Sequence, residues 1–333
     1  MKLAIIGATG LVGRKMIEVV HQRNIPYTEL ILSASERSVN KVYTVNNHQV
    51  RILSVEEVIK LKPDVALFSA GAEASLQYAP IFAGQGCFVI DNSSAWRMNE
   101  NIPLVVPEVN GSVLNIHSLI IANPNCSTIQ LVVAAYPLHL RYGLKRMIIS
   151  TYQSVSGTGM KGINQLFGER RQVNVEKVYP YPIDMNCLPH GGKFYDNGYT
   201  TEEIKLVEES RKIMNLPELE VSATVVRVPV VGGHSESVNL EFEKDIDMAE
   251  VTEILKNSAG IVVQDDPASN IYPMPLTSFD RDEVFVGRLR KDLYRNNGLN
   301  MWIVADNVRK GAATNAVQIL EYLISNHIVD AGA

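Results

Sequence analysis

The stretch Lys2-Leu3-Ala4-Ile5-Ile6-Gly7-Ala8-Thr9-Gly10-Leu11-Val12-Gly13 decides the fold class of this chain. Its first five residues are typical of a buried strand, and a helical pattern, Arg14–Val20, follows the last glycine. Glycines between a strand and a helix let the backbone approach a pyrophosphate, whose charge the helix N-terminus accepts. A plain strand-to-helix turn is the simpler alternative. The spacing G-x-x-G-x-x-G in this context predicts a Rossmann-type dinucleotide site that includes Gly7, Thr9, Gly10, Leu11, Val12 and Gly13.

The identity of the dinucleotide depends on the end of the second predicted strand. This strand ends near Leu30–Leu32 and leads into Ser33–Ser38, where a Rossmann fold selects its cofactor. An acid there favours the 2′-hydroxyl of NAD, and an arginine favours the 2′-phosphate of NADP. The segment contains both Glu36 and Arg37, and Lys41 follows closely. We expect NADP, with NAD as the alternative because of Glu36, and the predicted contacts are Ser35, Arg37 and Ser38.

Two later apolar runs predict further parallel strands of the same sheet. Asp64–Phe68 and Cys87–Ile90 are each followed by small or polar residues. Ligand groups gather at the carboxyl ends of parallel strands. We therefore expect Ser69, Gly71 and Asp91–Ser94 to line the cofactor crevice, and we expect Cys87, inside the strand pattern, to be structural.

Size and composition exclude several classes of function. With 333 residues the chain is long enough for two domains, and its net charge of −5, with scattered basic residues, gives no support for nucleic-acid binding. The cysteines are far apart and have no metal-ligand spacing, so neither a disulfide framework nor a metal site is expected. No signal-peptide pattern and no apolar run of about 18 residues is present, so we expect a cytoplasmic protein without a membrane span.

The segment Asn123-Pro124-Asn125-Cys126-Ser127-Thr128 predicts a reactive thiol. Pro124 ends the strand-like run Ser118–Ala122, and Asn125 is a favourable N-cap for a helix over 127–135. Cys126 would then lie in the first helical turn, where unpaired N–H groups and the helix dipole favour an anion. Such an environment makes a cysteine nucleophilic near neutral pH. The alternative is an inert buried cysteine.

Two polar segments after this helix carry further candidates. Gln153 follows the strand-like run Met147–Ser150 and offers a neutral amide that could orient a reacting oxygen or a water molecule. The run Thr201–Glu209 predicts a helix with an N-cap threonine at its start, and it places Glu202 and Lys205 on one face. An exposed strand end and a solvated helix face are the simpler interpretations of these two segments.

A third segment, Val225–Ser237, combines a buried cation with a histidine. Arg227 lies inside a β-branched run, where burial of its charge requires an anionic partner. His234 follows Gly232 and Gly233, which allow the chain to turn sharply and to present the ring to a cleft. Histidine is the usual group for proton transfer near neutral pH, although a structural histidine is the simpler alternative.

Seven motifs, in order, give the chain a resemblance to a known family. They are Gly7–Gly13, Asn92–Arg97, Pro124–Thr128, Thr151–Gly159, Glu202–Lys205, Arg227–Ser237 and Asp306–Ala316. Together they resemble the bacterial type of aspartate-β-semialdehyde dehydrogenase along nearly the whole chain.

The resemblance implies a thioester mechanism. Cys126 would attack L-aspartate 4-semialdehyde, hydride would pass to NADP⁺, and phosphate would release L-4-aspartyl phosphate. The biosynthetic direction is the reverse reaction, which supplies lysine, threonine, methionine and isoleucine synthesis. The residue roles implied are general acid/base for His234; a place beside the thioester for Gln153; substrate and phosphate binding for Arg97, Asn125, Ser156, Glu202, Lys205 and Arg227; and cofactor contacts for Gly157 and Asn315.

The expected architecture is α/β with a discontinuous cofactor domain. Residues 1–122 would form the Rossmann-type parallel sheet with its helices, completed by the C-terminal segment 307–333, in which we expect a helix from Arg309 through Leu323. Residues 123–306 would form a mixed α/β catalytic and dimerisation domain. The family expectation is a homodimer joined through these catalytic domains.

Two alternative functions stay open at this point. N-acetyl-γ-glutamyl-phosphate reductase shares the architecture and the thioester chemistry, but its cysteine typically lies in P-G-C-Y-P-T rather than in the P-N-C-S-T found here. A non-catalytic nucleotide-binding paralogue could dispense with Cys126, Gln153 or His234, and all three are present.

Overall fold

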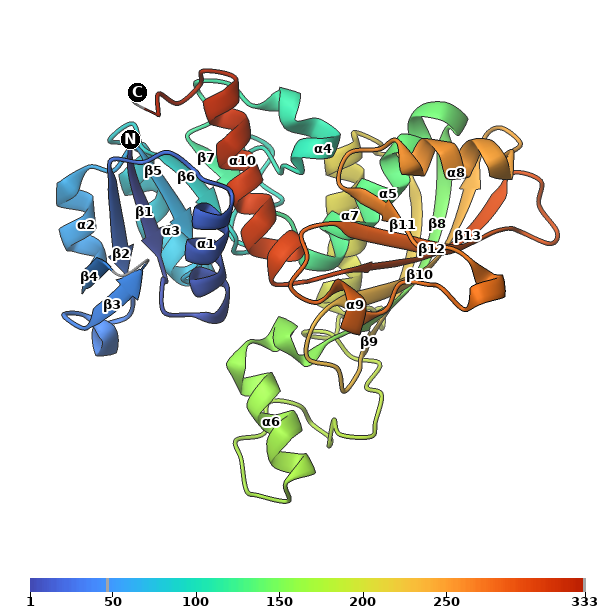
Figure 1. Ribbon diagram of the computed structural model, residues 1–333, viewed down its shortest axis with the longest axis horizontal. Coiled ribbons are helices and arrows are strands. Elements are labelled where there is room, and N and C mark those ends of the chain that lie inside the picture. The colour runs from blue at the N-terminus through green and yellow to red at the C-terminus, as the bar shows by residue number, and fades with distance from the viewer. Residues whose placement is uncertain (46–47, 332–333) are drawn as a thin grey trace. The chain divides into compact units, whose positions relative to one another are not determined.

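The computed structural model describes residues 1–45 and 48–331 and divides into two compact units, shown in Figure 1. The first unit comprises Met1–Pro124 and Ala312–Ala333, and the second comprises Asn125–Gly311. The unit boundaries thus lie at 124/125 and 311/312, whereas the sequence-based division placed them at 122/123 and 306/307.

A seven-stranded sheet in the order β3-β4-β2-β1-β5-β6-β7 organises the first unit. All neighbouring strands are parallel except β3, which pairs with β4 in the antiparallel sense. The predicted Rossmann-type sheet is confirmed. Its strands are β1 (Lys2–Ile6), β2 (Glu29–Ser33), β3 (Val42–Val45), β4 (His48–Leu53), β5 (Val65–Phe68), β6 (Phe88–Asp91) and β7 (Ile120–Ala122).

Helices cover both faces of this sheet, as Figure 1 shows. Alternate β1 residues point to opposite faces, so Leu3 and Ile5 join a core with α1 and α10, while Ala4 and Ile6 join one with α3. The helices are α1 (Leu11–Gln22), α2 (Val55–Leu61), α3 (Ala72–Ala83), α4 (Pro107–Asn110) and α10 (Thr314–Ser325). Burial on both faces explains why the strands of this sheet are apolar without alternation.

Two local predictions for the first unit need correction. Cys87 does not lie inside a strand but directly precedes β6, where it is buried. The C-terminal helix, predicted from Arg309, begins as an α-helix only at Thr314, because Arg309–Ala313 forms a π-helical turn.

A six-stranded mixed sheet in the order β11-β12-β13-β10-β8-β9 organises the second unit. Strand β10 is antiparallel to both β8 and β13, whereas β8 and β9 are parallel. The strands are β8 (Leu144–Gln153), β9 (Glu220–Arg227), β10 (His234–Phe242), β11 (Ile261–Val263), β12 (Val284–Lys291) and β13 (Gly298–Ala305).

One face of this sheet is covered by helices, with α5 across β8, β10 and β13 and with α7 against β9 (Figure 1). The other face leaves Ile148 and Tyr152 of β8 41% and 37% exposed. The helices are α5 (Cys126–Tyr142), α6 (Met160–Arg170), α7 (Thr201–Met214), α8 (Met248–Lys256) and α9 (Pro275–Ser278). The N-cap of α7 is Thr200, one residue before the predicted threonine.

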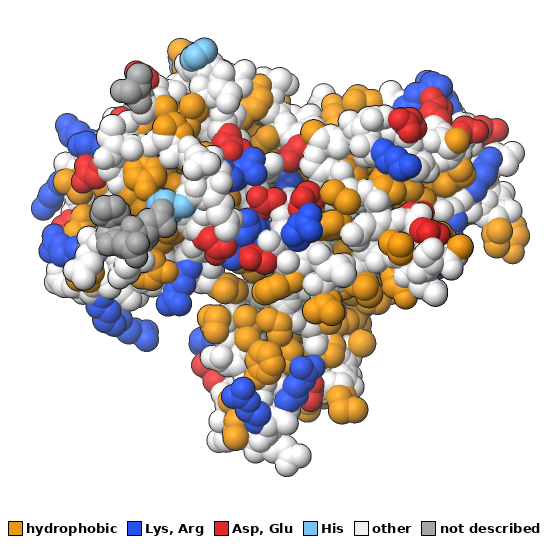
Figure 2. Space-filling model, in the orientation of Figure 1, with side chains coloured by type: hydrophobic (Ala, Val, Ile, Leu, Met, Phe, Trp, Pro, Cys, Tyr) orange, Lys and Arg blue, Asp and Glu red, His pale blue; other side chains and the backbone are white. Residues whose placement is uncertain are grey.

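Large apolar side chains are also exposed around α6, and Figure 2 shows them as a cluster over this segment. They include Met160, Phe167, Val173, Tyr181 and Phe194. In the described part of the chain, no helix combines the length and the apolar character that crossing a membrane requires.

Candidate active site

The predicted dinucleotide site is a cavity of about 400 Å³ within the first unit. Gly7, at the end of β1, has a φ of +89°, and a Cβ at this position would lie 2.4 Å from the carbonyl oxygen of Ser69. A Cβ at Gly13 would lie 2.2 Å from the carbonyl oxygen of Gly7. These two glycines therefore allow β1, the turn and α1 to approach closely, and they leave room for a ligand at the N-terminus of α1.

The cavity receives some of the predicted cofactor residues and not others. Its lining includes Gly7, Thr9, Gly10, Ser35 and Ser69, whereas Leu11, Val12, Gly13, Arg37, Ser38 and Gly71 do not contribute to it. Glu36 lines the cavity and the neighbouring Arg37 does not. Ser54–Glu56, at the start of α2, and Tyr78 on α3 also line the cavity, although no sequence motif marks them. The Tyr78 hydroxyl donates a hydrogen bond to Glu56 Oε1 at 2.8 Å.

Arg97 and Asn315 are held by hydrogen bonds within the first unit. Arg97 is 8% exposed, and its Nε and Nη2 donate to the carbonyl oxygens of Asn123 and Asn92 at 3.0 and 3.1 Å. Asn315 is fully buried, and its amide donates to the oxygen of Val105 and to Asn123 Oδ1. Both side chains are therefore fixed in orientation.

Cys126 is the first residue of α5, as the sequence predicted. Asn125 is the N-cap, and its Oδ1 accepts a hydrogen bond from the Ser127 N–H at 3.0 Å. The Asn125 N–H donates to Glu209 Oε2 at 2.6 Å. A Cβ at Gly311 would lie 2.7 Å from the Cys126 Cβ, so this glycine lets the chain pass close to the thiol. The half-buried Cys126 thiol thus lies in the positive field of the helix N-terminus.

Three predicted residues form one row across the central strands of the second sheet, which we call the candidate row: Arg227, Gln153 and His234. Gln153 and Arg227 are register partners on β8 and β9. The Ser235–Tyr152 pairing places His234 opposite Gln153 on the other side. Gln153 Nε2 donates to Ser127 Oγ at 2.9 Å, which ties the row to the turn that carries Cys126.

The His234 ring is fully buried, and its hydrogen bonds define its tautomer. The Ser154 backbone N–H donates to His234 Nδ1 at 3.1 Å, so Nδ1 is an acceptor and a neutral ring carries its proton on Nε2. Burial, reinforced by the charge of Arg227, lowers the pKa of His234 well below its ordinary value. Among the described residues, His234 Nε2 has no hydrogen-bond partner.

Arg227 and His234 border the same glycine. A Cβ at Gly157 would lie 3.0 Å from Arg227 Nη1 and 3.3 Å from His234 Nε2. Arg227 Nη1 donates to the Ser154 carbonyl at 2.7 Å, while its Nε has no partner in the described part of the chain. Because Gly157 has no side chain, the space beside Arg227 Nη1 and His234 Nε2 stays open to a substrate.

Glu202, Lys205 and Asn125 form a connected polar cluster. Lys205 Nζ forms an ion pair with Glu202 Oε1, and Asn125 Nδ2 donates to Glu202 Oε2 at 2.9 Å. Burial tends to raise the pKa of Glu202, but Lys205, Asn125 and Arg227 outweigh it and hold the pKa below the ordinary value. Glu202 is therefore an anion at neutral pH, close to the cap of α5.

Serine and asparagine side chains support this region and were largely missed. Ser156 is buried, and its hydroxyl donates to Asn307 Oδ1 at 3.0 Å; Ser154 Oγ makes the same kind of bond at 2.9 Å. Neither Ser154 nor Asn307 carries a distinctive local signal, since their proximity depends on a sequence separation of 153 residues.

The other two thiols differ from Cys126. Cys87 is buried, and burial raises the pKa of its thiol far above the ordinary value. Cys187 is exposed and lies outside any helix. No group of three or more His, Cys, Asp or Glu side chains in residues 1–45 and 48–331 could hold a metal ion.

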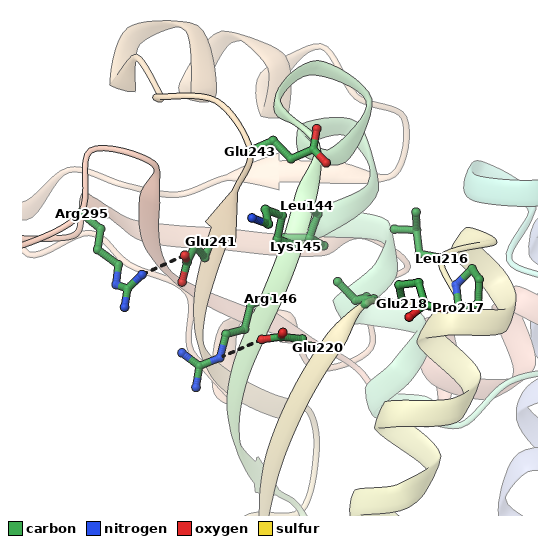
Figure 3. Close-up of a pocket in the computed structure, with 11 residues that line it drawn as sticks. Leu144, Lys145, Arg146, Leu216, Pro217, Glu218, Glu220, Glu241, Glu243 and Arg295 are labelled. Carbon is green, nitrogen blue, oxygen red and sulfur yellow. Dashed lines mark hydrogen bonds and ion pairs between the residues drawn. The ribbon is translucent and has the colours of Figure 1, made fainter.

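A larger cavity of about 610 Å³ lies elsewhere in the second unit, where β8 and β9 begin (Figure 3). Two ion pairs cross its wall, Arg146–Glu220 at 3.8 Å and Arg295–Glu241 at 2.8 Å. Its lining contains none of the predicted site residues and combines both signs of charge. We therefore place the candidate active site at the candidate row and the N-terminus of α5.

Comparisons with known proteins agree with this division. Residues 2–117 match the model of the semialdehyde dehydrogenase NAD binding domain, and residues 136–310 match the semialdehyde dehydrogenase dimerisation domain. An aspartate-semialdehyde dehydrogenase of Aquifex aeolicus is 50% identical, over 98% of this chain and 99% of its own length. This chain belongs to the aspartate-semialdehyde dehydrogenase family.

Further relatives extend the likeness over the full length. An aspartate-semialdehyde dehydrogenase of Bacillus subtilis is 43% identical over 99% of both chains. The crystal structure of aspartate semialdehyde dehydrogenase II from Vibrio cholerae superposes with a TM-score of 0.93 at 46% identity, and it covers 98% of this chain and 99% of that one. The same Vibrio enzyme has also been solved in complex with ASA. The first unit thus belongs to a nicotinamide-dinucleotide-binding family, and the second to a dimerisation family.

Proposed function

We propose that this protein reduces L-4-aspartyl phosphate to L-aspartate 4-semialdehyde with NADPH, and catalyses the reverse reaction, through a thioester on Cys126. The observation that carries the proposal is the position of Cys126 as the first residue of α5, tied through Ser127 to Gln153 of the candidate row. Membership in the family supplies the substrate class. The thiolate that this position favours is the form that attacks an acyl phosphate.

The reductive direction consumes one proton from solvent, which is taken up by the phosphate that leaves. The Cys126 thiolate attacks the acyl carbon of aspartyl phosphate, the C–O bond to phosphate breaks, and a thioester and inorganic phosphate result. NADPH, when bound, supplies the hydride that reduces the thioester carbon. The thiohemiacetal oxyanion then collapses to the aldehyde, and the carbon–sulfur bond breaks to regenerate the thiolate.

His234 and the start of α5 stabilise the charge on the oxyanion. In its neutral tautomer His234 carries a proton on Nε2, and because that N–H has no partner among the described residues it can donate to a substrate oxygen. We therefore assign His234 to the reacting oxygen as a donor, alongside N–H groups of α5. One such donor contributes about 10²- to 10³-fold in rate in other enzymes.

The charged groups of the substrate each have a partner of opposite sign in the proposal. Arg227 binds the α-carboxylate with its planar guanidinium, and Glu202 binds the α-ammonium. Lys205 and Asn125 of the second unit bind the phosphate. Ser156 supports the site through Asn307 rather than by a charge of its own.

The proposed cofactor is NADP, bound at the cavity of the first unit. The glycine turn fits a pyrophosphate because Gly7 and Gly13 leave no side chain between β1 and α1. Arg37 is our candidate for the 2′-phosphate, and Glu36, which lines the cavity, is the feature that would favour NAD. Arg37→Ala should lower the preference for NADP over NAD by about tenfold or more, and Glu36→Ala should raise it. An unchanged preference in both variants would exclude this segment as the selector.

We further propose a homodimer through the second unit. The exposed residues Ile148 and Tyr152 on the open face of its sheet, and the apolar cluster around α6, are surfaces that a partner copy would cover. Sedimentation equilibrium would measure the mass directly, and a monomer at micromolar concentration would contradict the proposal.

The proposed activity is tested by incubating the purified protein with L-aspartate 4-semialdehyde, phosphate and either NADP⁺ or NAD⁺. We expect phosphate-dependent formation of NADPH. Activity with N-acetylglutamate semialdehyde instead would identify the reductase alternative, and no activity with either aldehyde would favour the non-catalytic paralogue.

A further inference from the structure

A second row of buried polar side chains lies directly next to the candidate row on the same sheet face. Glu236 of β10 pairs in register with Thr151 of β8. Thr151 lies two residues before Gln153 on β8, and Glu236 lies two residues after His234 on β10. Because side chains two residues apart share a face, Thr151 and Glu236 point to the face that α5 covers. The next row inward, Ile149 and Val238, is apolar.

The polar atoms of this second row have no hydrogen-bond partners in residues 1–45 and 48–331. Thr151, Glu236 and Gln130 of α5 are all fully buried. Within the described residues, no hydrogen bond is made by either carboxyl oxygen of Glu236 or by either terminal side-chain atom of Gln130. The same holds for Thr151 Oγ1. A buried polar group without a partner opposes folding, so several in one place call for a common explanation.

Glu236 and Gln130 are close neighbours in this row. Burial raises the pKa of Glu236 well above its ordinary value, and the adjacent Gln130 amide lowers it to a smaller extent. A carboxylate at this depth would need a cation, and Glu236 has none among the residues that the structure describes. A protonated carboxyl group has one donor and one acceptor, which complement the acceptor and the donor of an amide.

The helix α5 meets the two rows at successive turns. Ser127 and Gln130 are three residues apart and therefore share a helix face. Ser127 bonds to Gln153 in the candidate row, and Gln130 lies against Glu236 in the second row.

We propose that Glu236 is a positioning residue for Cys126: its carboxyl group and the facing Gln130 amide, whose polar atoms bond to no other group in the described residues, act as one pair that fixes the first turns of α5 over the sheet. This inference rests on the proposed function, in which Cys126 is the nucleophile. Loss of the pair would release the turn that follows Cys126. A displacement of about 1 Å at a reacting group can lower the rate of the chemical step about 10²-fold.

Two variants of nearly equal length separate positioning from packing. Glu236→Gln keeps a donor and an acceptor, whereas Glu236→Met fills a similar volume and offers neither. We expect kcat of Glu236→Gln within about threefold of the wild type, and kcat of Glu236→Met lower by about 10- to 100-fold, with KM in both within about threefold. Equal kcat values in the two variants, or an effect confined to KM, would overturn the proposal.

The partnership with Gln130 is tested by a double-mutant cycle. If the two side chains act as a pair, Gln130→Met combined with Glu236→Met should lose no more activity than either single variant. Losses that multiply would show two independent residues and would contradict the pair.

A readout without substrate separates this inference from the proposed activity. In a Cys187→Ser background, iodoacetamide should modify Cys126 about threefold or more slowly in Glu236→Met than in Glu236→Gln. Slower alkylation would support positioning even if the protein does not reduce aspartyl phosphate. Equal alkylation rates would contradict positioning even if the protein does reduce it.

Thermal unfolding checks that Glu236→Met is folded. If it is not, infrared spectra of the wild type and Glu236→Gln at neutral pH still decide: the wild type should show a protonated-carboxyl band that the variant lacks, and its absence would overturn the uncharged assignment.

Discussion

The two helices that begin at candidate binding sites, α1 and α5, differ at their N-termini. The cap of α1 is Gly10, which has no side chain to bond the free N–H groups, and the first turn contains no acidic residue. The cap of α5 is Asn125, whose side chain bonds to Ser127, and the first helical residue is Cys126. The same dipole thus favours an external anion at α1 and the protein's own thiolate at α5.

This difference determines how each site should respond to substitution. The first site is built from backbone and glycine, so an added side chain should harm it by steric exclusion. The second is built from buried polar side chains, so even substitutions of similar size should harm it by removing a charge or a hydrogen bond. Substitutions at the two sites test this contrast, beginning with the one that should cost the most activity.

Replacement of the nucleophile should have the largest effect. Cys126→Ala should lower kcat by about 10⁴-fold or more, because no other group can form the thioester. NADPH affinity, measured by fluorescence titration, should stay within about twofold because α1 and its turn are unchanged. Residual turnover near that of the wild type would exclude the thioester route, and Cys187→Ser, at an exposed thiol, is the matched control that should retain full activity.

At the α1 site, Gly7→Ala should weaken cofactor binding by about 100-fold or more. Its Cβ would lie 2.4 Å from the Ser69 carbonyl oxygen, in a backbone conformation with φ of +89°. Gly86→Ala is the matched control, since Gly86 has a φ of +85° and open space around its Cβ position. The alkylation rate of Cys126 should be unchanged in both variants. If the control weakened NADPH binding equally, backbone strain rather than steric exclusion would be the cause.

At the α5 site, Arg227→Lys should raise KM for aspartate semialdehyde by about 10- to 100-fold with a smaller effect on kcat. A lysine keeps the charge but not the planar fork that binds a carboxylate with two hydrogen bonds. Arg146→Lys, at a half-exposed ion pair 3.8 Å long, should leave steady-state kinetics unchanged. A lower melting temperature with an unaltered KM would instead assign Arg227 a structural role.

The last prediction concerns stability rather than activity: a pH dependence at Glu236. Its raised pKa means that the folded state keeps a proton that the unfolded state releases above about pH 4.5. Wild-type stability should therefore fall as pH rises, and Glu236→Gln should escape this loss. The difference in unfolding free energy between variant and wild type should grow as pH rises above about 5, by at most about 1.4 kcal/mol per pH unit. Urea denaturation measures it, and a pH-independent difference would mean that Glu236 ionises in the folded state.

Local sequence signals predicted the first unit better than the second. The strand Lys2–Ile6 was predicted with its observed bounds, because an apolar run ends at a glycine that the turn requires. The helix that carries Cys126 was predicted over 127–135 but continues to Tyr142. It passes through Pro137, where tertiary packing of a buried helix overrides the local preference.

The candidate row could not be predicted as a row. Arg227, Gln153 and His234 come together through strand register, and register across long connections leaves no local signal. Glu236 lies within the motif Arg227–Ser237, but no local sequence signal indicates that its side chain is fully buried beside Gln130. Ser154, whose N–H determines the tautomer of His234, was missed for the same reason.

Covalent trapping tests the central claim most directly. The protein is mixed with L-4-aspartyl phosphate in the absence of NADPH, and its intact mass is measured after rapid acid quenching. We predict release of phosphate and a mass increase of one aspartyl group that maps to Cys126 and is missing in Cys126→Ala. An unmodified protein that nevertheless forms the aldehyde when NADPH is added would contradict the thioester on Cys126.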